Sequence, residues 1–262
     1  MGFVEASPTS EQPAQGGQGA TDWQRRVVGR SLEGAKRRSL DRSSALVRAA
    51  ARVLERTNGQ SLTVQEVADE AGQSLRTLYQ YFSSKDDLLL AVYEEAMQVY
   101  ARLLHAAIRP LDDPVERLAG AIIAAARMPV LHQRAGVDRG LSALRLQLSQ
   151  AAPELVARSQ APVTTLFREL VGEAMVDART TVGGVDAATY FVCAMRTSFI
   201  LSMTLGNEYA VEMPDVIDLS CFCVAGLGLE RSRPWHEAVD GRLELSRGQG
   251  RSILRRLARE PA

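Results

Sequence analysis

Residues 63–81 restrict the fold of this chain more than any other stretch, because two helix-start signals there lie on either side of one helix-stop signal. Thr63 followed by Glu66 forms a capping box, which predicts a helix that begins at Val64. Gly72 then provides the left-handed conformation that commonly ends a helix. The second start signal follows within two residues, so the two helices must cross steeply. This is the geometry of a helix-turn-helix.

The second of these helices has the side chains of a helix that reads DNA. Ser74 is placed to cap a short helix over residues 75–81, in which Leu75, Leu78 and Phe82 face inward. The outward side chains then offer the amide, hydroxyl and guanidinium groups that recognise base edges in a major groove. These predicted base-reading residues are Gln73, Ser74, Arg76, Thr77 and Gln80. The alternative is a helix-turn-helix that serves only to pack.

The start of the third helix is expected to bind the DNA backbone. Ser84 can cap it, yet Lys85 follows at the positively polarised end, which costs about 0.3–1 kcal/mol unless Asp86 and Asp87 offset it. A docked phosphate would make use of both the ammonium group and the free backbone N–H groups. The other predicted DNA contacts are Tyr79, Tyr81 and Arg42.

The chain resembles the tetracycline-repressor (TetR) family in the pattern Thr63-Val-x-x-Val-Ala-x-x-Ala-Gly-x-Ser-x-x-Thr-Leu-Tyr-x-Tyr-Phe-x-Ser-Lys-x-x-Leu-Leu. The resemblance covers about Ser39 to Leu90. Arg76 stands where the family often has glycine and Tyr81 where it often has histidine, so we expect Arg76 to determine specificity. The resemblance implies a homodimeric, ligand-responsive transcriptional regulator, most often a repressor, that binds a palindromic DNA operator.

The charge of the chain is zero overall but unevenly distributed. Residues 22–56 carry ten basic and four acidic groups, residues 231–262 carry eight and four, and residues 57–230 carry thirteen and twenty-one. Positive charge is therefore concentrated beside the helix-turn-helix and at the C-terminus, as expected of a protein that binds nucleic acid. The basic N-terminal arm is interpreted either as a solvated segment or as one that lies along DNA.

The pattern of apolar residues predicts an all-α fold, in which a three-helix helix-turn-helix domain is followed by a second helical domain. The resemblance implies that this second domain is a ligand-binding and dimerisation domain. The expected parts are a disordered basic arm (1–38), the DNA-binding domain (39–85), the second domain (86–230) and a basic extension (231–262) that docks loosely at most. The expected helices cover residues 43–57, 86–108, 114–127, 139–150, 154–180 with a bend or break at Pro162, 186–205 and 214–228.

The last two helices, around Tyr190 and Phe222, are apolar nearly all round. A helix of this kind is covered on both sides, either within one subunit or by a partner subunit, and we expect a homodimer. The middle of the second domain is rich in bulky apolar side chains, which form either a plain core or a cavity for an apolar effector. The predicted ligand-binding residues are Met128, Leu131, Leu144, Arg145, Leu148, Phe167, Met175, Tyr190, Met195 and Phe199.

Arg145 and Arg196 are each embedded in an apolar helical run. Either arginine meets the polar end of a ligand or it forms a structural ion pair.

Other classes of function find little support. The three histidines have no metal-ligand spacing, no glycine-rich phosphate loop is present, and the sequence indicates neither a cofactor nor catalysis. Three cysteines form no disulfide framework, and the longest apolar runs are interrupted by polar residues, so we expect a cytoplasmic protein without a membrane span. Two alternatives remain, a DNA-binding regulator whose second domain only dimerises or binds a protein, and an all-α protein with a vestigial helix-turn-helix.

Overall fold

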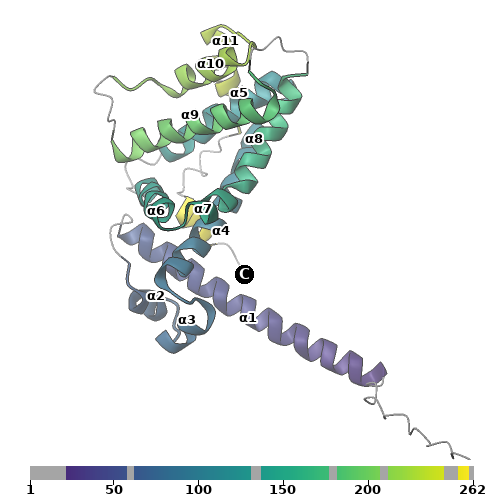
Figure 1. Cartoon of the computed structure of the whole chain (residues 1–262), viewed down its shortest axis with the longest axis vertical. Coiled ribbons are helices and arrows are strands. Elements are labelled where there is room, and N and C mark those ends of the chain that lie inside the picture. Colours follow the sequence, from purple (N-terminus) through teal and green to yellow (C-terminus); the bar gives the residue numbers. More distant parts are fainter. Residues whose placement is uncertain are drawn as a thin grey trace, which may run out of the picture. The chain divides into compact units, whose positions relative to one another are not determined.

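The computed structural model describes residues 22–57, 62–130, 137–176, 182–206, 212–244 and 253–259, and these ranges contain helices and no strand (Figure 1). The predicted all-α fold is confirmed. In chain order the helices are α1 (Asp22–Arg56), α2 (Val64–Glu70), α3 (Leu75–Tyr81), α4 (Lys85–Ile108), α5 (Pro114–Val130), α6 (Val137–Ala151), α7 (Pro153–Ser159), α8 (Ala161–Ala174), α9 (Val185–Leu205), α10 (Val216–Gly226), α11 (Arg233–Arg242) and α12 (Ile253–Leu257).

The chain divides into two compact units, residues 1–42 and residues 43–262. The first helix begins at Asp22, so the predicted start near Ser43 is wrong, and residues 22–38 are helical instead of forming a flexible arm. Leu32 and Leu40 are 64% and 56% exposed, which shows that burial does not account for this segment. Its arginine, lysine, leucine, alanine and glutamate residues have high intrinsic helix propensity, and it contains no proline. The disorder predicted for residues 1–21 lies outside the described residues.

The local signals of the helix-turn-helix act as predicted. The Glu66 N–H donates to Thr63 Oγ1 over 3.2 Å, and the Thr63 N–H donates to Glu66 Oε2 over 2.9 Å, which completes the capping box. Gly72 has a φ of 63°, in the left-handed region, directly after α2. The Ser74 hydroxyl accepts from the Thr77 N–H over 3.1 Å and caps α3.

Burial of apolar side chains holds α2 and α3 against residues 43–56 of α1. The side chains of Leu46, Val53, Val67 and Leu78 are fully buried, and Phe82 is 8% exposed. An ion pair adds to this packing.

Glu70 of α2 pairs with two arginines of α1. Arg52 Nε lies 2.7 Å and Arg56 Nη1 3.1 Å from its two carboxylate oxygens. Hydrogen bonds from Arg52 and Arg56 lower the pKa of Glu70, although partly exposed pairs of this kind stabilise by only about 0–1 kcal/mol.

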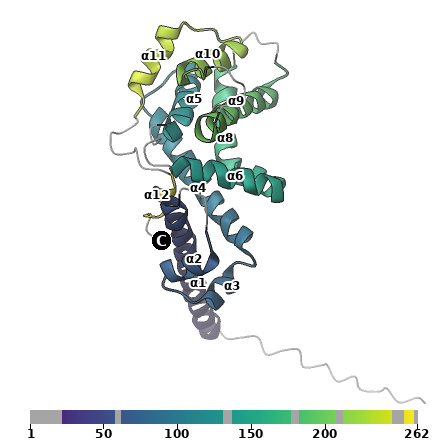
Figure 2. The ribbon, with the colours of Figure 1, turned by 90° about the vertical axis from the view of Figure 1, so that its left-hand side faces the viewer.

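The centre of the second half is α5, which packs against α4, α8, α9, α10 and α11 (Figures 1 and 2). Residues 118–126 of α5 are all buried and include five alanines and Gly120, so neighbouring helices approach closely. Pro162 divides the segment that was expected to bend or break, since proline lacks the N–H that a helix interior requires. The chain forms α7 before this point and α8 from Ala161 onward.

The C-terminal extension is packed, so its predicted loose docking is wrong for the described residues. Helix α11 lies against α5 and α10 with His236 and Val239 fully buried. Helix α12 lies against α4 and α6, with Ile253 and Leu257 5% and 4% exposed (Figure 2). The spacing of four residues places Ile253 and Leu257 on one face, and burying that face outweighs the solvation of the basic residues between them.

Helix α9 is long and apolar enough to cross a membrane by length and composition, which the sequence analysis did not expect. Core helices of soluble proteins meet the same criterion. Helix α9 packs against α5, α6, α8 and α10, and it carries a buried arginine, Arg196. These contacts bury one part of α9, while Tyr190, Phe191 and Met195 on the same helix are exposed.

Candidate DNA-binding surface and effector cavity

One face of α3 presents its polar side chains together. At 100° per residue, Tyr79, Arg76, Gln80 and Thr77 span an arc of about 160° on the helix, while Leu78 lies on the opposite side. Arg76 and Gln80 are exposed, Tyr79 is 50% exposed, Thr77 is half-buried, and Leu78 is fully buried. The structure therefore brings the central members of the predicted base-reading set onto one accessible face.

The hydroxyl groups at the start of α3 are already engaged with each other. Ser74 Oγ lies 2.8 Å from Thr77 Oγ1 and also caps the Thr77 N–H. One hydroxyl donates to the other, so the pair as a whole keeps one free O–H donor and spare acceptor capacity for a base edge or a bound water.

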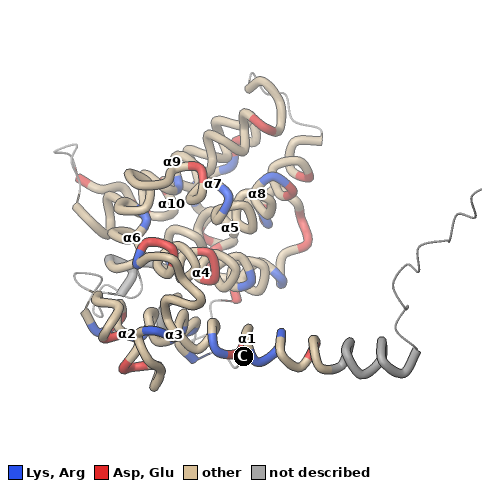
Figure 3. Tube along the Cα trace, turned by 60° about the horizontal axis from the view of Figure 1, so that its bottom comes forward, with Lys and Arg blue, Asp and Glu red and all other residues tan. Residues whose placement is uncertain are grey.

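The start of α4 lies next along the chain and combines a lysine with a capped helix end. The Asp87 N–H donates to Ser84 Oγ over 3.1 Å, and the Ser83 N–H donates to Asp87 Oδ2 over 2.8 Å. Lys85 is exposed on the first turn. Figure 3 shows basic colour on α3, whereas α2 carries acidic colour. Of α2 and α3, only α3 therefore carries positive charge, and α3 is the helix that the sequence predicts to contact DNA.

Three predicted DNA contacts are placed less favourably. Gln73 is half-buried, and Tyr81 is half-buried with its side chain against the core. Arg42 is exposed but belongs to the first unit, residues 1–42, and is not part of the surface described for α3 and α4.

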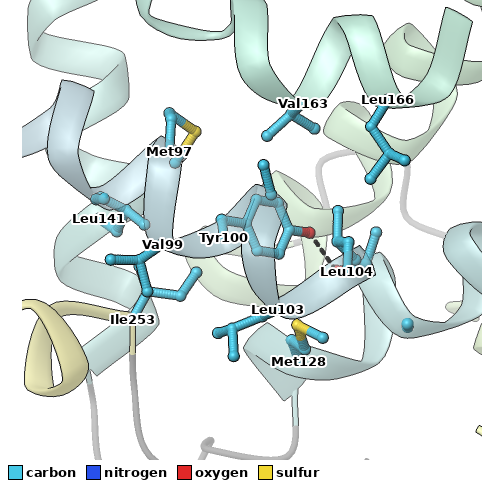
Figure 4. Packing of buried hydrophobic residues seen from close by; sticks show 14 of the residues in the cluster. Met97, Val99, Tyr100, Leu103, Leu104, Met128, Leu141, Val163, Leu166 and Ile253 are labelled. Atoms are coloured by element: carbon cyan, nitrogen blue, oxygen red, sulfur yellow. Dashed lines mark hydrogen bonds between the residues drawn. The ribbon is translucent and has the colours of Figure 1, made fainter. Parts of the chain in front are cut away.

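A cavity of about 60 Å³ lies among α4, α6, α9 and α12. Its lining residues are Tyr93, Met97, Tyr100, Leu141, Ser142, Arg145, Gln160, Arg196, Thr197, Ile200, Leu201 and Ile253. Met97, Tyr100, Leu141 and Ile253 are among the side chains drawn in Figure 4. A volume of this size holds a few water molecules or a small chemical group.

An open groove of about 950 Å³ adjoins the cavity on the side of α6 to α9. The two hollows share Arg145, Gln160, Arg196, Thr197 and Leu201 as lining residues. A ligand that places one end in the cavity therefore has room for the remainder along the groove, in the volume range typical of small-molecule sites.

Arg196 is the most unusual lining residue, because it is a charged side chain that is only 4% exposed. Its Cζ lies 5.2 Å from the ring centroid of Phe167 and 5.9 Å from that of Tyr100. Cation–π contacts stabilise by about 0.5–2 kcal/mol, less than the several kcal/mol that burying an ion costs. No carboxylate lies within ion-pair distance of Arg145 or Arg196 among the residues that the structure describes.

The phenol of Tyr93 lies beside these arginines. Burial raises the pKa of Tyr93, although Arg145 and Arg196 oppose the shift, so the hydroxyl stays protonated at neutral pH. The amide of Gln160 donates to the Tyr93 oxygen, which leaves the Tyr93 proton able to donate to a ligand. The Tyr100 hydroxyl donates to the Ala125 carbonyl over 2.7 Å and is fixed in place.

The predicted ligand residues divide into several groups. Arg145 lines both hollows and Tyr190 lines the groove. Among the others, Phe167 packs against Arg196, Leu131 lies outside the described residues, and Met195 is 39% exposed on α9. The remaining five belong to the packed core and line neither hollow; they are Met128, Leu144, Leu148, Met175 and Phe199.

Sequence reasoning missed most of the lining. Tyr93, Met97 and Tyr100 fall within the predicted helix 86–108 and Gln160 within the predicted helix 154–180, and none of them was singled out as a ligand residue. Ile253 was assigned to a solvated tail. No local signal distinguishes these residues, because it is the packing of α4, α6, α9 and α12 that brings them together.

The faces of α9 and α10 expose large apolar side chains. Tyr190, Phe191, Met195 and Phe222 are 69%, 57%, 39% and 65% exposed. Apolar residues clustered in this way mark interaction surfaces on soluble proteins.

Known sequences match the N-terminal part of the second unit. Residues 46–92 match the family model described as bacterial regulatory proteins, tetR family. These residues are similar to the tetR family in sequence. The tetR-family match spans α2, α3, the first turns of α4 and the part of α1 that packs on them.

The curated relatives match the same region. The HTH-type transcriptional regulator BetI of Brucella canis is 39% identical over 81 residues, which are 31% of this chain and 41% of BetI. The HTH-type transcriptional regulator HbdR of Aromatoleum sp. is 31% identical over 82 residues, which are 31% of this chain and 36% of HbdR. The chain thus spans less than half the length of these relatives.

The fold is similar to that of solved structures over about three quarters of the chain. RolR in complex with resorcinol superimposes with a TM-score of 0.56 at 18% identity, covering 79% of this chain and 96% of RolR. FadR of Bacillus subtilis in complex with stearoyl-CoA superimposes with a TM-score of 0.52 at 18% identity, covering 72% of this chain and 98% of FadR. A helix-turn-helix domain followed by a helical second domain is therefore the fold of this chain.

Proposed function

We propose that the protein is a ligand-responsive transcriptional regulator that binds a palindromic operator as a homodimer, most simply as a repressor, and that a small molecule in the α4–α6–α9 cavity controls DNA binding. The observation that supports this most directly is that α4 carries both sites. Lys85 lies on its first turn and Tyr93 lines the cavity eight residues later, about 12 Å along the helix.

The mechanism follows from this shared helix. An effector that contacts Tyr93, Met97 and Tyr100 would favour one tilt of α4, and a tilt of α4 would shift α3 relative to the partner subunit's α3. A coupling of about 1–3 kcal/mol would change operator affinity by roughly 5- to 150-fold. Because the effect is thermodynamic, the operator would change effector affinity by the same factor.

The proposed dimer uses the exposed apolar faces of α9 and α10. Two half-sites of a palindrome require two α3 helices related by a two-fold axis, which a monomer does not supply. The proposed DNA-reading residues are Ser74, Arg76, Thr77, Tyr79 and Gln80, with Lys85 on a phosphate. A regulator that acts on DNA in this way would work in the cytoplasm.

The alternative that the second domain only dimerises or binds a protein partner is less well supported, because it assigns no role to the buried Arg196 and the half-buried Arg145 beside it. RolR and FadR, which share the fold, were crystallised with small molecules. Their identity to this chain is too low to transfer either ligand.

The test is selection of duplexes from random double-stranded DNA with the full-length protein. We expect an enriched inverted repeat bound by two chains, as measured by light scattering of the complex. Recovery of no common sequence, or of a single half-site bound by one chain, would contradict the proposed operator and dimer.

A further inference from the structure

Arg196 has fewer polar partners than a buried charge requires. Its Nε has no hydrogen-bond partner among the described residues, and its Nη2 reaches only the neighbouring Thr197 hydroxyl, at 3.5 Å. The aromatic rings of Tyr100 and Phe167 contact the guanidinium but accept no strong hydrogen bond from it. A guanidinium has five N–H donors in a fixed fork, so most of the donors of Arg196 are left for another group.

Arg145 reaches the same cavity from α6. Its Nε is also buried without a partner among the described residues, and its side chain approaches the Tyr93 hydroxyl. Three groups from three helices therefore converge, namely two guanidinium groups and a phenol that stays protonated. All three donate hydrogen bonds, and two of them carry a positive charge.

The acidic group that would balance this charge is missing from the described lining. The cavity lining contains no aspartate or glutamate, and the groove lining contains only Asp186, which pairs with Arg168 at 2.8 Å. Arg168 is 62% exposed, so that pair lies in solvent. In contrast, Arg196 is 4% exposed and Arg145 is half-buried with its Nε covered, so an anionic ligand at the junction of cavity and groove would supply hydrogen-bond acceptors and negative charge to both arginines.

We propose that the effector is an amphipathic anion, whose carboxylate or phosphate head is held between Arg145 and Arg196 with a hydrogen bond from Tyr93. Met97, Leu141 and Ile200 supply apolar walls for the atoms next to the head, and the adjoining groove takes the remainder of the molecule. This inference rests on the proposed function, since it specifies the chemistry of its effector, and it adds a charged head to the apolar ligand expected from sequence.

The test uses octanoate, octyl phosphate and octanol with the full-length protein. We expect both anions, at equal concentration, to raise the midpoint of thermal unfolding and octanol to leave it nearly unchanged, since the three share an apolar chain and differ in charge. A stronger response to octanoate would assign a carboxylate effector, and a stronger response to octyl phosphate would assign a phosphate ester. Equal responses to all three compounds, or a response only to octanol, would overturn the proposal.

Two methionine variants separate a ligand-binding arginine from a structural one. Arg196→Met keeps an unbranched side chain without the charge, and Arg158→Met is the matched control, at an exposed position of α7 that lines neither hollow. We expect Arg196→Met to weaken binding of the preferred anion by about tenfold or more in calorimetry and Arg158→Met to leave it unchanged.

The unliganded variants provide a second readout. A buried charge that awaits a ligand destabilises the empty protein, so Arg196→Met should unfold at a higher temperature than the unsubstituted chain. An Arg196→Met protein that unfolds at a lower temperature and still binds the anion normally would show that Arg196 has a structural role.

The measurements also separate this inference from the proposed function. Anion binding that leaves operator affinity unchanged would support the site and contradict its role in regulation. Specific operator binding by a protein that responds to none of the three compounds would support the DNA-binding function and contradict the anion site.

Discussion

At the scale of single residues, the DNA-binding surface separates a reading group from a positioning group. Arg76 is exposed in the middle of the outward face of α3, and Lys85 is exposed at the capped start of α4. A bidentate guanidinium distinguishes one base pair from another, whereas an ammonium group on a phosphate does not.

Arg76→Ala and Lys85→Ala should therefore differ in kind. On the selected operator we expect Arg76→Ala to cost about 1–3 kcal/mol and to relax preference at one position. Lys85→Ala should weaken specific and random DNA alike and lower the salt slope by about one. Titrations against both DNAs at several salt concentrations measure this, with exposed Arg158→Ala on α7 as control. Equal losses on both DNAs for Arg76→Ala would remove its role in reading.

A buried histidine makes the stability of the protein dependent on pH. His236 is fully buried, its Nδ1 lies 3.0 Å from Ser220 Oγ, and the Trp235 ring lies against it. Burial lowers the pKa of His236 below its ordinary value of 6.5, and the charge of Arg231 lowers it further. The unfolded chain therefore takes up a proton at a higher pH than the folded protein does.

The contribution of His236 to the free energy of unfolding should be fully present above pH 6.5. It should fall as the pH drops below that value, by at most about 1.4 kcal/mol per pH unit. Chemical unfolding between pH 8 and 5.5 measures this. His236→Gln should flatten the dependence, and His105→Gln, at an exposed position, should not. An unchanged slope in His236→Gln would contradict the assignment.

At the scale of helices, close packing in the second domain depends on α5. A Cβ added at Gly120 would lie 2.6 Å from Leu111 Cδ1 and 2.9 Å from Leu243 Cδ2, whereas one added at Gly172 of α8 would lie 3.9 Å from Val185 Cγ1. Both glycines are helical, so alanine has the same intrinsic advantage at each, about 0.5–1 kcal/mol.

Gly172→Ala should therefore stabilise the protein by about that amount. In Gly120→Ala this gain should be outweighed by the overpacking, which costs about 1–3 kcal/mol. Denaturant unfolding of the two variants side by side gives the comparison. Equal stabilisation by both would show that Leu111 and Leu243 rotate away without strain.

Helix α12 is the element whose docking connects the cavity to the DNA-binding domain. Ile253 lines the cavity, Leu257 is buried, and Arg52 of α1 donates to the Ala258 carbonyl over 3.4 Å. We expect Leu257→Asp to detach α12, because docking against α4 and α6 would bury an unpaired carboxylate.

Hydrogen exchange should then become faster where α12 covers α4 and α6, while the rest of the domain stays protected. Arg259→Asp places the same carboxylate at an exposed position and should leave exchange unchanged. Protection of α4 and α6 that is identical in both variants would show that α12 contributes little to their cover.

At the scale of the whole molecule, function as proposed requires two copies of the chain. Phe191 on α9 and Phe222 on α10 are 57% and 65% exposed. Exposure of this extent is unusual for phenylalanine in a monomer and is expected at a subunit interface. Burying an unpaired charge in such a seam is strongly unfavourable.

Phe191→Asp and Phe222→Asp should each yield a monomer, and both should lose cooperative operator binding. Val176→Asp is the control, since Val176 is 79% exposed near the end of α8, outside these two helices. Light scattering of the four proteins reports the mass. A dimer that persists in both phenylalanine variants would exclude the α9–α10 interface.

The sequence alone determined the helix-turn-helix and most helix ends. Thr63, Gly72, Ser74 and Ser84 act on backbone groups within four residues of themselves, so their effect depends little on the rest of the molecule. The all-α character has the same origin, because the spacing of apolar residues sets which face of each helix is buried. The resemblance of the second domain's sequence to other proteins was too weak to add residues to this set.

Tertiary structure decided the remainder. Arg145, Arg196 and Tyr93 lie far apart in the chain and meet only because α6, α9 and α4 pack around one cavity. Whether such arginines find acidic partners depends on every neighbouring helix. The docking of α11 and α12 was misjudged for the same reason, since the surfaces that receive Val239 and Ile253 are formed by α5, α10, α4 and α6, and a local pattern contains no information about them.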